Sequence, residues 1–365
     1  MAEITTRREP SGQTARGLGA SVARAALVGA LLLNALAASA EITGAGATFP
    51  SQVYLRWAAS YEKQKGSSVL YRPTGSGDGV KQITARTVQF GASDTPLSPK
   101  DLAERRLVQV PMLVGGIVPV VNLPGLGEKR LQLSGELLAD IMAGEVKQWR
   151  DPRITELNPG LALPALPIRR IVQSEKSGTT DGLTRYLSTS SQNFATKVGT
   201  GQLPNWPGEV ERVAGNDGMA RMLKTMPGAI TYVSFDRAQQ DHLSAVKLRN
   251  AAGKWVEASE PAFRSAILES DLARSGNDLA SLTDRPGESS WPITMTSFIL
   301  VDATPASGES ASATLRFVYW CLMHGDELTH GTGFAPIPIA LQARLSARFQ
   351  QVRAQDQKPL NFMDF

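Results

Sequence analysis

The stretch Glu175-Lys176-Ser177-Gly178-Thr179-Thr180 follows an apolar run, residues 168–172, and precedes a segment in which Leu183, Tyr186 and Leu187 recur at helical spacing. Small residues at such a strand-to-helix junction leave the first backbone N–H groups of the helix uncovered. Together with the positive end of the helix dipole and the neighbouring hydroxyls, these groups can bind an anion. An ordinary helix cap, which Ser and Thr favour, would explain the same residues. The stretch alone leaves both interpretations open.

Three earlier segments repeat this design, each an extended run that ends in small or polar residues. The second, residues 68–79, joins a short strand to a glycine-rich turn, and the third, residues 88–94, ends in a carboxylate. The first, residues 42–50, leads into a helical face made by Val53, Trp57, Ala58 and Tyr61. Strands that alternate with helices predict an α/β fold with a mainly parallel sheet. Because ligands of such sheets bind beyond the carboxyl ends of the strands, all four junctions are expected at one edge.

Composition bounds the class of protein. At 365 residues and 42% hydrophobic, the chain can bury a large core and is long enough for two lobes. Its 38 basic and 34 acidic residues nearly balance, and no basic run or interleaved aromatic stripe suggests a nucleic-acid partner. Cys321, the only cysteine, lies in an apolar run and is expected to be a buried thiol. Three scattered histidines give no support for a metal site or a Ser-His-Asp triad, so no cofactor is predicted.

The first 40 residues are typical of a targeting segment. An arginine-bearing start leads into the apolar run 25–33, and Ala38-Ser39-Ala40 supplies small residues for cleavage before Glu41. The apolar run is short for a bilayer span, so a retained membrane anchor is the less favoured alternative. We therefore expect residues 1–40 to be a signal peptide cleaved near Ala40.

Two apolar segments are candidates for crossings between lobes, residues 110–121 and residues 291–301. Two crossings would return the end of the chain to the first lobe. We therefore expect lobe 1 to comprise residues 41–118 and 297–365, and lobe 2 to comprise residues 119–296. Further expectations are helices near 308–323 and 340–354, a turn at Gly215-Asn216-Asp217-Gly218, and a surface tail over 357–365.

The four junctions suit a small tetrahedral oxyanion, because hydrogen bonds to a charged partner are about twice as strong as neutral ones. Asp94 would repel fully ionised sulfate but could accept the proton that hydrogen phosphate still carries. A helix cap or an exposed turn would be the plain explanation for this aspartate. The Walker motif G-x-x-x-x-G-K-[ST] is missing, and residues 75–79 fail the spacing G-x-G-x-x-G. Lys176-Ser177-Gly178 is similar to a triplet of penicillin-recognising enzymes, but no Ser-x-x-Lys stands in a suitable context. Binding is therefore favoured over catalysis.

The chain as a whole resembles the family of periplasmic phosphate-binding proteins that serve the phosphate-specific ABC transporter. The resemblance runs in order from about residue 41 to 300. It rests on Thr43-Gly44-Ala45-Gly46-Ala47-Thr48-Phe49-Pro50, Val80-Lys81-Gln82-Ile83, Phe90-Gly91-Ala92-Ser93-Asp94, Leu157-Asn158-Pro159-Gly160, Ser177-Gly178-Thr179-Thr180, Gly215-Asn216-Asp217-Gly218, Pro227-Gly228-Ala229-Ile230 and Trp291-Pro292-Ile293-Thr294.

This resemblance implies a monomeric, two-lobed type II periplasmic binding protein that is not an enzyme. It would close around inorganic phosphate and deliver it to an inner-membrane ABC permease and its ATPase complex. The phosphate contacts carried over by position are Thr48, Phe49, Pro50, Ser76, Asp94, Ser177, Gly178 and Thr179. Gln173, Glu175 and Lys176 would stand just behind these contacts.

Two positions depart from the family pattern. Members usually carry Arg-x-Asp before x-Ser-Gly-Thr, and this chain has Gln173 and Glu175 there. Arg169 lies four residues back along the strand, too far to substitute, and Lys176 would supply a point charge rather than a guanidinium fork. Asp78 adds a carboxylate to a turn that the family often fills with glycine. Phosphate binding is therefore expected to be weaker than is usual for the family.

Three alternatives stay open. The chain could be a paralogue retuned to another oxyanion or to sensing. It could also be an exported phosphoesterase on the same scaffold, although no nucleophile or metal motif was found for one. A structural or adhesive role would predict that no small ligand binds.

Overall fold

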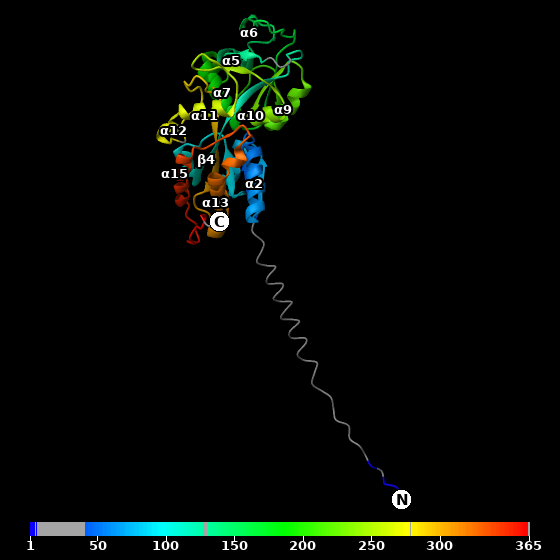
Figure 1. The fold of residues 1–365 in the computed structure, drawn as a ribbon, viewed down its shortest axis with the longest axis vertical. Coiled ribbons are helices and arrows are strands. Elements are labelled where there is room, and N and C mark those ends of the chain that lie inside the picture. Colours follow the sequence, from blue (N-terminus) through cyan, green and yellow to red (C-terminus); the bar gives the residue numbers. More distant parts are fainter. Residues whose placement is uncertain (4, 6–40, 127–129, 278, 364–365) are drawn as a thin grey trace. The chain divides into compact units, whose positions relative to one another are not determined.

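The strand β4 (Leu107–Val121) organises the fold, and all 15 of its residues are buried. This confirms the buried strand expected over residues 110–121. The computed structural model describes residues 1–3, 5, 41–126, 130–277 and 279–363. Glu41–Phe365 forms a compact unit of its own, shown in Figure 1. Nearly all of the expected signal peptide, and its cleavage site, lie outside the described residues.

The main sheet has the strand order β2-β1-β3-β12-β4-β8-β6-β7, and β13 and β9 also pair with β4. A second, small sheet has the order β11-β10-β5. In addition to β4, the strands of the two sheets are β1 (Ile42–Gly46), β2 (Val69–Pro73), β3 (Phe90–Ser93), β5 (Gln132–Leu133), β6 (Arg169–Gln173), β7 (Glu211–Val213), β8 (Ala229–Ser234), β9 (Ser244–Ala245), β10 (Lys247–Arg249), β11 (Trp255–Val256), β12 (Thr294–Asp302) and β13 (Ala335–Pro336).

The sheet is mixed, which corrects the expectation of a mainly parallel sheet. Strand β1 is parallel to β2 and β3, and β6 is parallel to β7 and β8. In the centre, β12 runs antiparallel to both β3 and β4, and β4 runs antiparallel to β8. The difference arises because the two apolar segments taken as crossings pair with one another as long antiparallel strands, rather than as isolated connections.

Fourteen α-helices and one 3₁₀ helix are found in the described residues. They are α2 (Ser51–Lys65), α3 (Ser76–Thr84), α4 (Pro99–Arg105), α5 (Gly135–Ala143), α6 (Pro152–Leu157), α7 (Gly178–Ser190), α8 (Gln192–Lys197), α9 (Gly215–Thr225), α10 (Phe235–Gln240), α11 (Glu260–Leu268), α12 (Asp271–Ser275), α13 (Gly308–His324), α14 (Asp326–Thr329), α15 (Ile339–Ser346) and η1 (Ala347–Gln351). None of the helices in the described part of the chain has the length and apolar character needed to cross a bilayer.

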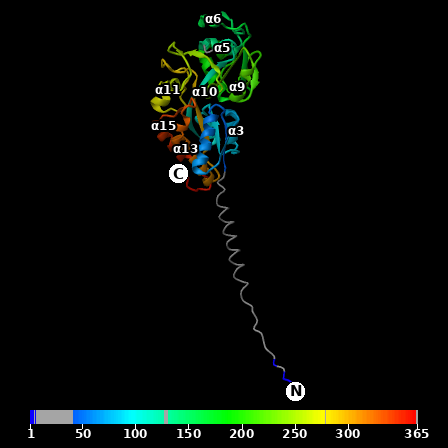
Figure 2. The same ribbon diagram turned by 45° about the vertical axis from the view of Figure 1, so that its right-hand side comes forward.

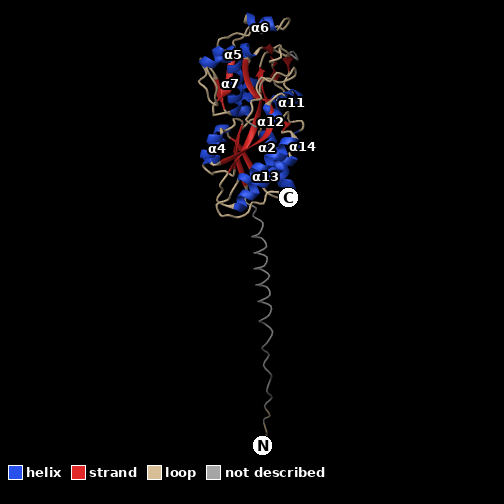
Figure 3. Ribbon diagram, turned by 90° about the vertical axis from the view of Figure 1, so that its left-hand side faces the viewer, coloured by secondary structure: helices blue, strands red, loops and turns tan. Residues whose placement is uncertain are grey.

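The helices gather around the two ends of β4. Helices α5, α7 and α9 surround one end, and α2, α13 and α15 surround the other (Figure 1), an arrangement that persists when the view is turned (Figure 2). Figure 3 separates the two groups in the same way, with sheet strands running between them. The long strand therefore connects both halves of this compact unit.

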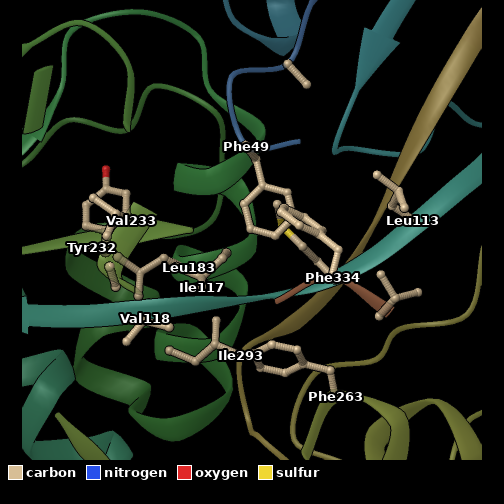
Figure 4. Packing of buried hydrophobic residues seen from close by; sticks show 14 of the residues in the cluster. Phe49, Leu113, Ile117, Val118, Leu183, Tyr232, Val233, Phe263, Ile293 and Phe334 are labelled. Atoms are coloured by element: carbon tan, nitrogen blue, oxygen red, sulfur yellow. The ribbon is translucent and has the colours of Figure 1, made fainter. Parts of the chain in front are cut away.

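One hydrophobic cluster extends through both halves. Figure 4 shows its middle, with Ile117 and Val118 of β4 close to Leu183 and Tyr232. The ring of Phe49 meets that of Phe334 edge-on, with centroids 5.0 Å apart. This packing holds the turn after β1 against the body of the protein.

Several expected elements are confirmed and two are corrected. The face of α2 predicted from Val53, Trp57, Ala58 and Tyr61 is buried, and so is Cys321 in α13. The second C-terminal helix is shorter than expected, because α15 ends at Ser346 and gives way to a 3₁₀ helix. The tail is not a plain surface segment, since the ring of Phe362 is buried against Tyr319 and Phe349.

Candidate functional site

Three of the four junctions meet at Ser76, Asp94 and Gly178. The Ser76 hydroxyl donates to Oδ2 of Asp94 at 3.3 Å, and the backbone N–H of Asp94 donates to Oγ of Ser76 at 3.1 Å. A Cβ at Gly178 would lie only 2.5 Å from Cβ of Asp94 and 2.6 Å from Oγ of Ser76. Only glycine permits this approach, so the start of α7 lies directly against the ends of β2 and β3.

The glycine-rich turn after β2 is shaped by its contact with the stretch before α7. Gly75 adopts a φ of +100°, a backbone conformation that residues other than glycine rarely adopt, and α3 begins at the next residue. The backbone N–H of Gly77 donates to the carbonyl oxygen of Lys176 at 3.2 Å. A Cβ at Gly77 would lie 2.5 Å from Cβ of Lys176. The glycines thus let two distant segments touch through their backbones.

Helix α7 begins with a cap and an uncovered first turn. Ser177 is the N-cap, and its Oγ accepts a hydrogen bond from the N–H of Thr180 at 3.2 Å. The N–H groups of Gly178 and Thr179 belong to the first turn, where no partner exists within the helix. The cap and the anion site are therefore compatible interpretations, because a hydroxyl that accepts from Thr180 can still donate its own hydrogen.

Asp94 is the only acidic side chain among the expected phosphate contacts, and it is 6% exposed. Its Oδ1 has no hydrogen-bond partner in the described residues, none of which forms an ion pair with it. Burial raises the pKa of Asp94 to about 7, an effect that the hydroxyls of Ser297 and Ser76 partly offset. A buried acceptor with a free oxygen and a pKa near neutrality can share a proton with a weak polyprotic acid.

Thr48, Phe49 and Pro50 are placed by the turn between β1 and α2. Phe49 and Pro50 are buried, Pro50 at the N-cap position of α2, whereas Thr48 is half-buried. Oγ1 of Thr48 accepts a hydrogen bond from Nδ2 of Asn216 at 3.0 Å. The first junction is therefore hydrogen-bonded to Asn216, a residue for which no role was predicted from the sequence.

Asn216 also connects to the fourth junction. Its Nδ2 donates to Oγ1 of Thr179 at 3.3 Å, and its Oδ1 accepts from the N–H of Ser234 at 2.8 Å. The segment Gly215–Gly218 was expected to be a turn, and it is instead the first turn of α9. The available signal was an amide residue at the start of a helical pattern, beside three small or acidic residues.

The three residues expected just behind the phosphate contacts, Gln173, Glu175 and Lys176, differ in burial and in hydrogen bonding. Gln173 is 1% exposed, and neither Nε2 nor Oε1 has a partner in the described residues. Oε1 of Glu175 accepts from the N–H of Gly215 at 2.9 Å, which ties the stretch before α7 to α9. The Lys176 side chain is exposed. Arg169 is exposed and pairs with Glu211 at 3.4 Å, consistent with its expected distance from the site.

Asp78, the other departure, is accounted for locally. It is half-buried in α3, and its Oδ2 accepts a hydrogen bond from Nε2 of Gln82.

Two cavities are lined by residues of the junctions. One of about 240 Å³ is lined by residues that include Thr48, Glu175 and Asn216, and one of about 350 Å³ by residues that include Asp94.

Known proteins resemble this chain over most of its length. Residues 33–322 match the model of the PBP superfamily domain. The phosphate-binding protein PstS of Haemophilus influenzae is 40% identical over 311 residues, covering 85% of this chain and 92% of that protein. The PstS protein of Pasteurella multocida is 38% identical over 339 residues, covering 92% and 98%.

Solved structures share the fold. A high-affinity periplasmic phosphate-binding protein, solved with phosphate bound, matches with a TM-score of 0.65 at 21% identity, covering 84% of this chain and 93% of that one. The phosphate-binding protein of Stenotrophomonas maltophilia matches with a TM-score of 0.61 at 18% identity, with the same coverage. Given these matches and the relatives that align along most of its length, this chain belongs to the PstS family of phosphate-binding proteins.

Proposed function

We propose that this chain is a periplasmic solute-binding protein that captures inorganic phosphate and delivers it to an inner-membrane ABC permease and its ATPase complex. The observation that carries the proposal is the buried carboxylate of Asp94, which lies beside Ser76 and the N-terminus of α7 and has one oxygen without a hydrogen-bond partner in the described residues. The protein binds its ligand without turning it over.

The phosphate contacts in this proposal combine neutral donors with one acceptor. The donors are the hydroxyls of Thr48, Ser177 and Thr179 with the backbone N–H groups of Phe49, Gly178 and Thr179, and Pro50 fixes the turn that presents them. The hydroxyl of Ser76 would join them by turning its hydrogen from Oδ2 of Asp94 to the phosphate. Asp94 accepts the proton of hydrogen phosphate. Sulfate carries no proton at neutral pH, so it would leave this buried acceptor unmatched and is rejected.

We further propose two lobes, residues 41–118 with 297–365 and residues 119–296. Three hydrogen bonds near the site join these proposed lobes. Two were described above, Gly77 to Lys176 and Asn216 to Thr48, and in the third Thr95 Oγ1 donates to Asp181 Oδ2 at 3.0 Å. At the proposed hinge, the N–H of Ile117 donates to the carbonyl of Ile293, and Trp291 Nε1 donates to the carbonyl of Ile117. Opening would break the first set and keep the second.

Calorimetric titration tests the proposed ligand. The purified protein is first freed of bound phosphate by unfolding, dialysis and refolding, and is then titrated with phosphate, arsenate and sulfate. We expect phosphate and arsenate to bind, because both retain a proton near pH 7, and sulfate to bind at least about 10³-fold more weakly. Equal binding of sulfate and phosphate, or no binding by a folded protein, would contradict the proposal.

The unpaired amide of Gln173 favours a second candidate within the binding class, a receptor retuned to another oxyanion or to sensing. The same titration separates the two, because a retuned receptor would bind a different anion more tightly than phosphate. Export to the periplasm is tested independently by sequencing the N-terminus of the protein recovered from periplasmic extracts, which we expect to begin near Glu41.

A further inference from the structure

Asn216 makes hydrogen bonds to both sides of the site described above. It is 1% exposed, and its side chain uses all of its strong hydrogen-bonding directions but one lone pair. Nδ2 donates to Oγ1 of Thr48 at 3.0 Å and to Oγ1 of Thr179 at 3.3 Å, while Oδ1 accepts from the N–H of Ser234 at 2.8 Å. Two expected phosphate contacts from distant parts of the chain thus share one partner.

The backbone contact fixes which amide atom faces the threonines. An N–H group can only donate, so the atom of Asn216 that meets the N–H of Ser234 is the oxygen. The nitrogen must then face Thr48 and Thr179, and it can only donate to them. Each hydroxyl therefore accepts one hydrogen bond from Asn216 and has its own hydrogen left to donate elsewhere.

We propose that Asn216 is a positioning residue that sets Thr48 and Thr179 as donors toward the bound anion. The inference rests on the proposed function and deepens its site. An oxyanion accepts hydrogen bonds only, so a threonine hydroxyl that points its hydrogen at the protein contributes nothing to binding. By donating to one lone pair of each hydroxyl, Asn216 directs their hydrogens away from itself and to the ligand, and it links the two sides of the site when they close.

The isosteric substitution Asn216→Asp tests this role. The carboxylate still accepts from Ser234, but it presents acceptors to Thr48 and Thr179 and so turns their hydrogens away from the anion. It also adds a negative charge that repels phosphate directly. The two effects are separated by measuring the same substitution in a Thr48→Val background and in a Thr179→Val background, where one hydroxyl is already missing.

We expect Asn216→Asp to weaken phosphate binding by about 100-fold or more in the otherwise wild-type protein. In each valine background the loss should be smaller by about tenfold, because only the charge and the remaining hydroxyl contribute. An equal loss in all backgrounds would overturn the proposal, since a purely structural or electrostatic role gives additive effects. Phosphate binding by the wild type must be seen first, and its failure would instead contradict the proposed function.

Asn158→Asp is the matched control. Asn158 is also buried, its Oδ1 accepts from the N–H of Gln132, and its Nδ2 donates to two backbone carbonyls far from the expected contacts. We expect this substitution to lower the unfolding temperature without changing phosphate affinity. If Asn216→Asp does not fold, a crystal structure of the wild-type phosphate complex decides: Oγ1 of Thr48 and Thr179 must both lie within hydrogen-bond distance of phosphate oxygens, and their turning away would refute the role.

Discussion

Asp94 shows how much chemistry a single residue can carry in this site. Its carboxylate is buried beside neutral hydroxyls and is not balanced by a cation from the described residues. This arrangement opposes ionisation and raises the pKa of Asp94 to about 7. In the proposed phosphate complex, the unpaired oxygen of Asp94 would accept the proton of hydrogen phosphate. The burial of this carboxylate therefore explains both its raised pKa and the proposed selectivity for phosphate over sulfate.

The raised pKa of Asp94 predicts a pH dependence of stability that Asp94→Asn removes. The pKa of Asp94 is higher in the folded than in the unfolded protein, so the folded state binds the proton more tightly and stability falls as pH rises from about 4 to about 7. The unfolding free energy of Asp94→Asn minus that of the wild type should therefore rise by on the order of 4 kcal/mol from pH 4 to pH 8. Urea unfolding without phosphate at both pH values measures this. Parallel pH profiles for the two proteins would show that Asp94 is not held as described.

Gln173 gives a second prediction at this scale. Its amide is buried without a partner in the described residues. The resemblance described above leads us to expect arginine at this position. Gln173→Arg should tighten phosphate binding by about tenfold or more, because a guanidinium forms two charge-assisted hydrogen bonds with an oxyanion. Gln173→Met, which removes the amide but keeps the size, should weaken binding. Calorimetry measures both, and unchanged affinity in the two variants would mean that Gln173 does not face the anion.

The residues that meet at the site could be predicted from sequence where they follow strands. Ser76, Asp94 and Gly178 were expected together because each stands at the carboxyl end of a strand or at the helix that follows it. Asn216 was missed because its role depends on the hydroxyls of Thr48 and Thr179, which no local pattern reveals. The missing partner of Gln173 was likewise invisible, because burial of both amide atoms is a property of the packed protein.

At the scale of elements, we propose that Ser177, the N-cap of helix α7, combines a structural and a functional task. Ser177 accepts a hydrogen bond from the N–H of Thr180 and can still donate its own hydrogen to the proposed anion. Ser134 caps α5 in the same way, accepting the N–H of Leu137 at 3.1 Å. The pair allows capping to be separated from binding.

Ser177→Ala and Ser134→Ala should each cost about 1 kcal/mol of unfolding free energy, because each removes a helix cap. Only Ser177→Ala should also weaken phosphate binding, by about tenfold, through the loss of one hydroxyl donor. Urea unfolding and calorimetry on both variants check this. Should phosphate affinity survive Ser177→Ala unchanged, the serine would be a cap and nothing more.

Elements with a strong hydrophobic period could be predicted from the sequence, and those set by distant contacts could not. The buried strand β4 and the amphipathic helix α2 are confirmed. Helix α15 ends early because a tighter 3₁₀ turn places Phe349 against Tyr319 and Phe362, with ring centroids 6.1 Å and 5.5 Å away. The same cluster buries the tail. Tertiary packing thus overrode a continuous helical pattern.

For the whole molecule, the α/β class could be predicted, but the mixed centre of the sheet could not. The two apolar segments taken as crossings pair antiparallel along nine residues of β12, because the second returns in the direction opposite to the first. By the proposed boundaries, most of this pairing lies within lobe 1, and only Thr294, Met295 and Thr296 belong to lobe 2. The contacts across the site, by comparison, are a few single hydrogen bonds. We propose that the two lobes close about this antiparallel pair when phosphate binds.

The crystal structure of the protein with bound phosphate is the most direct test of the central claim. We expect one phosphate between the turns after β1, β2 and β3 and the first turn of α7, with an oxygen within about 2.7 Å of a carboxylate oxygen of Asp94. Phosphate bound elsewhere, or at this site with Asp94 turned away from it, would contradict the account.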